Sequence, residues 1–306
     1  MIEFVENNID TLATALYTTC DDYLNAHPEL LPPRPKIGIH PRITDAEIIT
    51  LAVVESLQGY TSQRHFIRHA KKCLTSAFPY IPQQSGYNKR LRKLTETMQH
   101  VMTHLATSTG LLNDDVWVVD STPVECGRSR ETVKRSDLAG YAEYGYCASH
   151  SRFFWGCRLH LITTLHGLPV GYALTGAKAD ERTALVAIIN SLAPRSVEAI
   201  TLMADKGYAG KDLETLLHDE GITLLRPAKK RENPRSGKQF LKPLRQTIES
   251  VFNTMKSQLH LEQHGSRTAG GLVCQVVKRL LALTAAIWHN HVTGQPVLRS
   301  LIAYDH

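Results

Sequence analysis

The stretch WGCRLHLITTLHGLPVGYALT, from Trp155 to Thr175, is typical of two β-strands joined by a tight turn. Apolar and β-branched residues fill both halves, and His166 followed by Gly167 stands between them, as in a β-hairpin. The shorter stretch VWVVD, from Val116 to Asp120, precedes the hairpin and has the apolar run of a buried strand. The sequence therefore predicts three successive strands in the middle of the chain.

Helices and strands alternate after this hairpin. Asp180 is a typical N-cap for the helix that follows, and a helix over Lys211–Asp219 separates two further strands, at 198–205 and 222–227. The last two helices are expected at 244–259 and 272–291. This order of elements predicts an α/β protein with a mixed five-stranded sheet flanked by helices.

The first 110 residues read as a separate, all-helical region. Apolar residues recur at helical spacing over Ile2–Ala26, and the proline-rich segment His27–Pro41 reads as a linker or an extended arm. Thr44 and Glu47 form a capping box that opens a helix ending before Gly59. A further helix is expected over 62–77.

The last helix of this region begins near Ser85 and is strongly basic. The stretch SGYNKRLRKL packs four cations into about one and a half helical turns, namely Lys89, Arg90, Arg92 and Lys93. Several short helices with a basic last member fit a helix-turn-helix-like DNA reader, and a plain helical bundle has the same signature. We interpret the region as DNA-binding and keep the bundle as the alternative.

Composition and charge exclude several classes of protein. With 306 residues, 42% of them hydrophobic and 21% charged, the chain is neither disordered nor a membrane protein by composition. No signal peptide is evident in the first ten residues, so we expect a cytoplasmic protein without a membrane partner. The six cysteines show no CxxC spacing, which argues against a disulfide framework and a zinc site. The net charge of +6 is compatible with a polyanionic partner.

Two acidic residues stand at strand ends. Asp120 ends the first predicted strand and Asp205 ends the fourth. Functional groups of open α/β sheets gather just beyond strand ends, so both carboxylates face one site if these strands are neighbours. Each acid could instead be a turn or cap residue, Asp120 in DSTP and Asp205 in DKGY.

A third acid lies on the helix LRQTIESVFNTMKSQL, from Leu244 to Leu259. Its apolar residues form a stripe for packing on a core, and Arg245, Glu249 and Lys256 share an arc of about 40° beside that stripe. Taken alone, this arrangement fits a solvated ion pair. Together with Asp120 and Asp205 it fits two-metal phosphoryl transfer, in which carboxylates hold Mg²⁺ and cations balance the charge and contact phosphate.

Three segments together carry a resemblance to a known family. The stretches VWVVDST, ITLMADKGY and RQTIESVFNTMK resemble the signature segments of DDE-type insertion-sequence transposases, over about residues 116–293. In that family the third segment often carries Tyr, Arg, Glu and Lys, and Arg245, Glu249 and Lys256 match that spacing. Lys242 stands where the family often has Tyr, which leaves the subgroup open.

The resemblance implies a fold, an activity and partners. It implies a ribonuclease H-like catalytic domain over 111–306, in which Asp120, Asp205 and Glu249 bind two Mg²⁺ ions, with Mn²⁺ as a substitute. It also implies cleavage of transposon ends by water and attack of the freed 3′-hydroxyl on target DNA. The helical residues 1–110 would then recognise double-stranded terminal inverted repeats, and a homodimer or larger assembly, associated with a prokaryotic nucleoid, would pair the two ends.

Two basic tracts are candidates for DNA contact. The first combines Arg128, Arg130, Lys134 and Arg135 with several tyrosines and Phe153, a mixture that tracks phosphates and stacks on unpaired bases. The second runs from Arg226 to Arg245, with eight cations against Glu232 alone, and includes Lys229, Lys230 and Arg231. A solvated surface loop is the alternative for the first tract.

Two other functions fit parts of this pattern. A ribonuclease H-like endonuclease without strand transfer would use the same acids and metals. An inactive, domesticated DNA-binding protein or repressor would keep the fold alone, although the intact acids argue against it. Ser121 and Tyr208 are potential covalent nucleophiles, but the sequence shows no activating base for either.

Overall fold

The computed structural model describes residues 8–34, 41–147, 151–192 and 199–295, together with Leu301 and Tyr304. Parts of three predicted elements lie outside the described residues. They are 2–7 of the first helix, 35–40 of the proline-rich segment and 198 of the fourth strand. The chain divides into two compact units. Unit 1 comprises residues 1–109, 255–266 and 270–306, and unit 2 comprises 110–254 and 267–269.

The two units differ from the predicted domains in one respect. The first boundary lies next to the predicted one, between Thr109 and Gly110. The sequence assigned all of 111–306 to one domain, whereas 255–266 and 270–306 cluster with the N-terminal helices. The long last helix therefore belongs to the helical unit, because its apolar surface packs there.

Unit 1 is built from helices that follow the predicted pattern with shifted ends. Asn8 caps the first helix, and Thr44 with Glu47 forms the predicted capping box of the second. The third helix ends at Cys73, four residues before the predicted end at Ala77. The helices of this unit are α1 (Ile9–Ala26), α2 (Asp45–Leu57), α3 (Gln63–Cys73), α4 (Gln84–Lys93), α5 (Thr95–Ser108) and nearly all of α10 (Ala269–Val292).

A buried ion pair joins α10 to α2 inside unit 1. Lys278 Nζ lies 2.9 Å from Glu55 Oε1, and each side chain is only 1% exposed. The Tyr87 hydroxyl of α4 donates to Glu55 Oε2 at 2.8 Å. Three helices far apart in sequence thus share one buried carboxylate, which explains why the C-terminal segment belongs to this unit.

The helix α10 is apolar and long enough to cross a membrane by length and composition alone. However, 83% of its most apolar window is buried inside the protein. Its hydropathy is accounted for by packing, as in the core helix of a globular unit.

Unit 2 contains a mixed sheet of six strands, one more than predicted. Its strands are β1 (Val116–Gly127), β2 (Glu143–Cys147), β3 (Arg152–Thr164), β4 (Pro169–Gly176), β5 (Ile200–Met203) and β6 (Ile222–Leu225). The additional strand is β2, which pairs with the start of β3. The sequence predicts no strand there, because charged and aromatic residues obscure the alternation of a strand.

The strand order brings the first and fourth predicted strands together. Neighbouring strands run β2-β3-β1-β5-β6, and β4 pairs with the remaining length of β3. The β1–β3 and β3–β4 pairs are antiparallel, whereas β1–β5 and β5–β6 are parallel. The predicted α/β class and its ribonuclease H-like strand order are confirmed.

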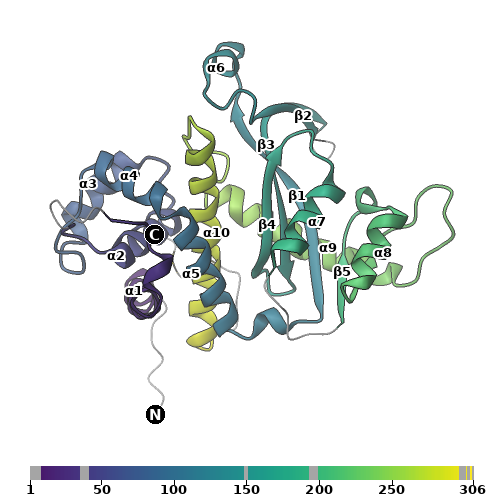
Figure 1. Ribbon diagram of the computed structural model, residues 1–306, viewed down its shortest axis with the longest axis horizontal. Helices are drawn as coiled ribbons and strands as arrows, with labels where there is room; N and C mark the ends of the chain where they lie inside the picture. Colours follow the sequence, from purple (N-terminus) through teal and green to yellow (C-terminus); the bar gives the residue numbers. More distant parts are fainter. Residues whose placement is uncertain are drawn as a thin grey trace. The chain divides into compact units, whose positions relative to one another are not determined.

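Helices cover this sheet. Figure 1 shows α7 (Glu181–Ser191) lying against the strands and α8 (Lys211–Asp219) beside β5. Trp117 and Val119 of β1 share one core with Leu185 of α7 and Leu213 of α8. Since side chains alternate along a strand, residues 118 and 120 point to the opposite face.

The helix α9 (Lys238–Ser257) begins six residues before the predicted start, although Pro243 lies within it. Its segment up to residue 254 belongs to unit 2. Ile248 and Val251 are buried, as the apolar stripe predicts.

Candidate active site at the ends of the parallel strands

Asp120 and Asp205 both lie just beyond the point where β1 and β5 stop pairing. Val118 of β1 pairs with Met203, the last residue of β5, and each acid lies two residues further along the chain. The predicted strand end at Asp120 is wrong, because β1 continues to Gly127 and Asp120 pairs there with Leu161 of β3. The two strands are neighbours, as a common site for the two acids requires, and the catalytic role of the acids stays a prediction.

The two acids line one small cavity. It measures about 30 Å³ and lies between the middle of β1, the end of β5 and the helix α9. Arg245 and Ile248 contribute the helical wall. Its lining residues are Val119, Asp120, Met203, Ala204, Asp205, Pro227, Leu241, Arg245 and Ile248.

Burial and like charges make Asp120 a weak acid. Burial, with smaller contributions from the carboxylates of Asp205 and Glu181, raises its pKa from 3.8 to about 6. The Ser121 backbone N–H, which donates to Asp120 Oδ1 at 2.7 Å, and the Arg245 guanidinium act in the opposite direction. Negative charge is thus concentrated at this edge of the sheet.

Asp205 begins a short turn as well as lining the cavity. Its Oδ1 accepts a hydrogen bond from the backbone N–H of Gly207 at 2.5 Å, at the start of the 3₁₀ turn η4 (Lys206–Tyr208). The cap role that the sequence offered as an alternative is therefore present. It does not exclude a ligand role, because the second carboxylate oxygen takes no part in this bond.

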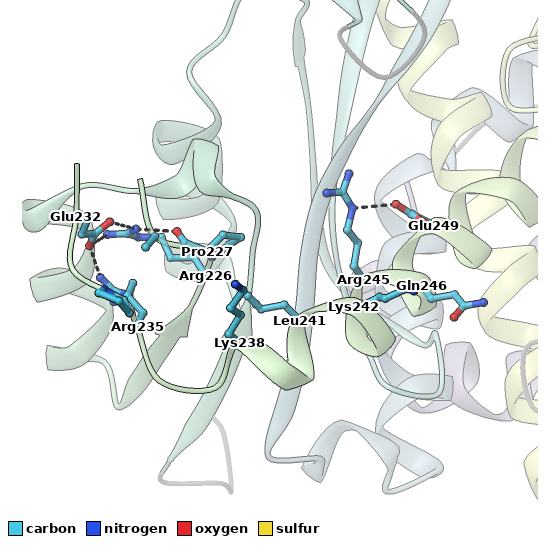
Figure 2. Close-up of a pocket in the computed structure, with 12 residues that line it drawn as sticks. Arg226, Pro227, Glu232, Arg235, Lys238, Leu241, Lys242, Arg245, Gln246 and Glu249 are labelled. Atoms are coloured by element: carbon cyan, nitrogen blue, oxygen red, sulfur yellow. Dashed lines mark hydrogen bonds and ion pairs between the residues drawn. The ribbon is translucent and has the colours of Figure 1, made fainter. Parts of the chain in front are cut away.

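Glu249 does not join the two aspartates. Its Oε1 accepts from Arg245 Nε at 2.8 Å, and both side chains are more than half exposed. Figure 2 shows this pair on α9, with the Glu249 carboxylate directed at the Arg245 guanidinium. Within the described residues, no group of three or more His, Cys, Asp or Glu side chains is arranged to hold a metal ion.

Electrostatics accounts for the separation of Glu249. Three carboxylates at one point repel one another unless cations offset their charge. The spacing of residues along α9 predicts that Glu249 lies beside Arg245, and the structure shows this pair. The spacing does not determine the direction of the Glu249 carboxylate. Its role as a metal ligand stays a prediction.

A larger cavity of about 840 Å³ adjoins α9 (Figure 2). Arg226 and Arg235 on its wall are already paired, since both bind Glu214 of α8 and Glu232. The second basic tract is therefore less positive than the sequence suggested, because the fold brings Glu214 to it. The lining residues are Arg226, Pro227, Ala228, Glu232, Pro234, Arg235, Lys238, Leu241, Lys242, Arg245, Gln246 and Glu249.

Other residues of the second basic tract remain at the surface. Lys230 and Arg231 are exposed on a turn, and Lys229 Nζ donates to the Ala209 carbonyl at 3.3 Å. Lys256, predicted to contact phosphate, lies in the segment assigned to unit 1, with its Nζ 3.4 Å from Glu262 Oε1.

The first basic tract forms a short helix beside an aromatic strand surface. Arg130, Lys134 and Arg135 lie on α6 (Arg130–Arg135), and Arg128 precedes it with 81% of its side chain exposed. Arg130 and Lys134 line a cavity of about 620 Å³ with Tyr144. The exposed aromatic residues beside it are Tyr144, Tyr146 and Phe153.

The four cations of α4 divide into two kinds. Arg90 forms an ion pair with the buried Asp45 and donates to the Ile43 carbonyl at 2.5 Å. Its guanidinium is thus engaged inside unit 1. Lys89, Arg92 and Lys93 are exposed.

One acidic residue near the site was not singled out from the sequence. Glu181 is the first residue of α7, and Ser121 Oγ donates to its Oε1 at 2.7 Å. The available signal was its place at a helix start directly after β4, where α/β proteins position functional groups. Neither a motif nor a charge cluster marks it in the sequence.

Comparisons with known proteins assign the family. The family model "Transposase DDE domain" matches residues 112–285, more than half of the chain. A comparison with curated proteins gives no significant match.

Among solved structures, a piggyBac transposase synaptic complex with hairpin DNA is similar at 9% sequence identity, with a TM-score of 0.46 over 96% of this chain and 78% of that chain. At that identity and TM-score, the likeness does not establish a shared mechanism. The matched family segment contains Asp120, Asp205 and Glu249 and spans every strand of the sheet. The chain belongs to the transposase DDE domain family.

Proposed function

We propose that this protein is a transposase that cuts DNA at transposon ends and joins the freed 3′-hydroxyl to target DNA. The observation that carries the proposal is that Asp120 of β1 and Asp205, which follows the neighbouring strand β5, line one small cavity inside the segment that matches the transposase domain. Glu249 is the proposed third acid, and it lies on the helix after the last strand.

The donor chemistry of the site fits divalent cations. Asp120 and Asp205 offer carboxylate oxygens, which Mg²⁺ prefers, and both line one cavity. When bound, two Mg²⁺ ions, with Mn²⁺ as a substitute, would activate the attacking oxygen and stabilise the leaving oxygen. Asp120 and Asp205 would hold them, together with Glu249 once its carboxylate leaves Arg245.

Arg245 connects the two parts of this proposed site. Its guanidinium lines the cavity of Asp120 and Asp205 and also binds Glu249. A guanidinium in that place is suited to bind a phosphate, because its planar fork donates hydrogen bonds to two oxygens at once. We assign Arg245 to the DNA phosphate next to the scissile bond, and Lys256 to a neighbouring phosphate.

Unit 2 also carries surfaces suited to DNA. Positive charge beside exposed aromatic rings gives both phosphate contact and base stacking. We assign this role to the surface of Arg128, Arg130, Lys134 and Arg135, and assign phosphate contact to Lys229, Lys230 and Arg231.

Unit 1 is the proposed reader of the terminal inverted repeats. Lys89, Arg92 and Lys93 on α4 offer exposed cations, whereas Arg90 stabilises the unit. A homodimer or larger assembly on DNA would pair the two ends, and target DNA is the second partner.

End cleavage tests the proposal directly. The substrate is a labelled duplex carrying the ends of the element that encodes this chain, incubated with the full-length protein and Mg²⁺. We expect nicks at the element boundary with the wild type and none with Asp120→Asn, Asp205→Asn or Glu249→Gln. Full cleavage by Glu249→Gln would remove Glu249 from the site, and full cleavage by all three variants would refute the proposed function.

A further inference from the structure

The carboxylate of Glu181 is held in a defined position beside the two aspartates. Asp180 caps α7, which fixes the backbone of the first helical turn. Ser121 Oγ donates to Glu181 Oε1 at 2.7 Å, and Arg158 Nη1 lies 3.4 Å from the same oxygen. These contacts use Oε1, and they hold Oε2 in a constant direction.

That second oxygen faces Asp205 across Gly207. A Cβ atom added at residue 207 would lie 2.6 Å from Glu181 Oε2 and 2.8 Å from Asp205 Oδ1. Any side chain at this position would collide with both carboxylates, so the glycine allows the two acids to approach one another.

Asp120 belongs to the same electrostatic group. Asp120 lines one small cavity with Asp205, and Glu249 is not among the residues that line it. The acid that approaches this aspartate pair in the structure is therefore Glu181, through its position across Gly207 from Asp205.

A buried hydroxyl points to a ligand at this group. The Tyr208 side chain is fully buried, and its hydroxyl has no hydrogen-bond partner among the described residues. Tyr208 directly follows Gly207, across which the carboxylates of Glu181 and Asp205 approach one another. Buried hydroxyls are normally hydrogen-bonded, and water molecules around a cation would supply both donors and acceptors here.

Glu181 also lines a cavity whose wall carries several cationic side chains. It lines a cavity of about 520 Å³ together with Arg182, Lys206 and Lys229. Arg182 is paired with Asp180, and Lys206 and Lys229 bring further positive charge to the same wall. A polyanion can approach Glu181 from this side without meeting net negative charge.

We propose that Glu181 is a positioning residue for a divalent cation that Asp120 and Asp205 bind before DNA arrives and without Glu249. Glu181 and the Tyr208 hydroxyl hold water molecules of this cation, because Mg²⁺ and Mn²⁺ keep several waters when bound by one or two carboxylates. This agrees with the finding that no three acids among the described residues are arranged to bind one metal ion directly. The inference rests on the proposed function and adds a residue to its site.

Manganese binding to the DNA-free, full-length protein tests the inference. Binding is measured by electron paramagnetic resonance of free Mn²⁺ and by calorimetry, so the readout does not depend on activity. Glu181→Gln keeps an acceptor for Ser121 and removes only the charge. We expect it to weaken Mn²⁺ binding by about tenfold, the size of effect found for residues that orient metal ligands.

Matched variants separate this role from general electrostatics. Asp180→Asn removes a charge one residue away and keeps an N-cap, so Mn²⁺ affinity should stay within about twofold of wild type, as for other residues without a contact to the metal site. Glu249→Gln should also bind Mn²⁺ normally. Tyr208→Phe should also weaken Mn²⁺ binding. If Glu181→Gln fails to fold, this variant tests whether the group around Glu181 holds the waters of the cation.

The outcomes distinguish this inference from the proposed function. Wild-type affinity in both Glu181→Gln and Tyr208→Phe, with binding lost in Asp205→Asn, would overturn the inference and leave the proposed function intact. Mn²⁺ binding that requires DNA or Glu249 would also overturn it. Mn²⁺ binding that survives in Asp205→Asn would count against the metal site itself and hence against both.

Discussion

Arg245 and Glu249 form an ion pair one helical turn apart on α9, with 2.8 Å between Nε and Oε1 and both side chains more than half exposed. Exposed pairs at this spacing contribute only about 0.3–0.5 kcal/mol. The pair is therefore weak enough to open for the phosphate that we propose on Arg245 and the cation that we propose on Glu249.

Arg245→Ala should separate stability from function. Because the ion pair is weak, the free energy of unfolding should change by less than about 0.5 kcal/mol, measured by urea denaturation. DNA cleavage should fall by about tenfold to a hundredfold, since a charged hydrogen bond to phosphate contributes about 1.5–3 kcal/mol. Arg245→Lys is the control, and it should recover only part of the activity because it cannot bind two oxygens in a fork.

Stability should depend on pH through Asp120. Its pKa is raised from 3.8 to about 6, so the folded protein binds this proton more tightly than the unfolded chain. Stability from this group is therefore fully present below pH 3.8 and is lost as pH rises to about 6. The loss is at most about 3 kcal/mol.

Asp120→Asn should remove this pH dependence. We expect its midpoint of thermal unfolding to exceed that of the wild type at pH 8 and to match it at pH 4. Glu249→Gln, which changes an exposed carboxylate, is the control and should follow the wild-type profile. A wild-type profile in Asp120→Asn would contradict the assigned burial and charge environment of Asp120.

The buried pair of Glu55 and Lys278 should be essential for the stability of unit 1. Lys278→Met leaves a buried carboxylate without its cation and should lower the free energy of unfolding by about 3–5 kcal/mol. The double variant Glu55→Leu with Lys278→Met should lose less, since no unpaired charge remains. Urea denaturation of both variants measures the difference, and equal losses would show that packing volume, not charge, determines the effect.

The basic residues of α4 should fall into two classes. Lys89→Ala and Lys93→Ala should weaken binding to terminal-repeat DNA and lower the salt dependence by about one unit each. Arg90→Ala should instead destabilise unit 1, because it leaves the buried Asp45 with one cation fewer. Binding titrations at several salt concentrations, with thermal unfolding of the same samples, test this division.

The sequence predicted those helices and strands that have a clear hydrophobic periodicity or a clear capping residue. The hairpin of β3 and β4, the cap at Asp180 and the helix over Lys211–Asp219 follow from local rules and match the structure. The strand β2 was missed because its exposed aromatic residues hide the alternation of a strand. The place of α10 in unit 1 was missed because it depends on the contact between Glu55 and Lys278. These residues are far apart in sequence, and local sequence patterns do not predict such contacts.

Part of the candidate site could also be predicted from the sequence. Strand order brings Asp120 and Asp205 to one cavity, although β1 does not end at Asp120 as the sequence suggested. Glu249 was placed on the correct helix, but the direction of its carboxylate depends on Arg245 and on repulsion from other acids. Glu181 could not be found in advance, since its role rests on its contact with Ser121 and on Gly207, which are distant in sequence.

Strand transfer tests the central claim most directly. The full-length protein is incubated with Mg²⁺, a supercoiled target plasmid and a pre-cleaved element end that exposes its 3′-hydroxyl. We expect covalent joining of the labelled end to the plasmid by the wild type and none by Asp205→Asn. Efficient cutting of intact ends without any joining, over a range of metal and salt concentrations, would contradict the account and identify a nuclease.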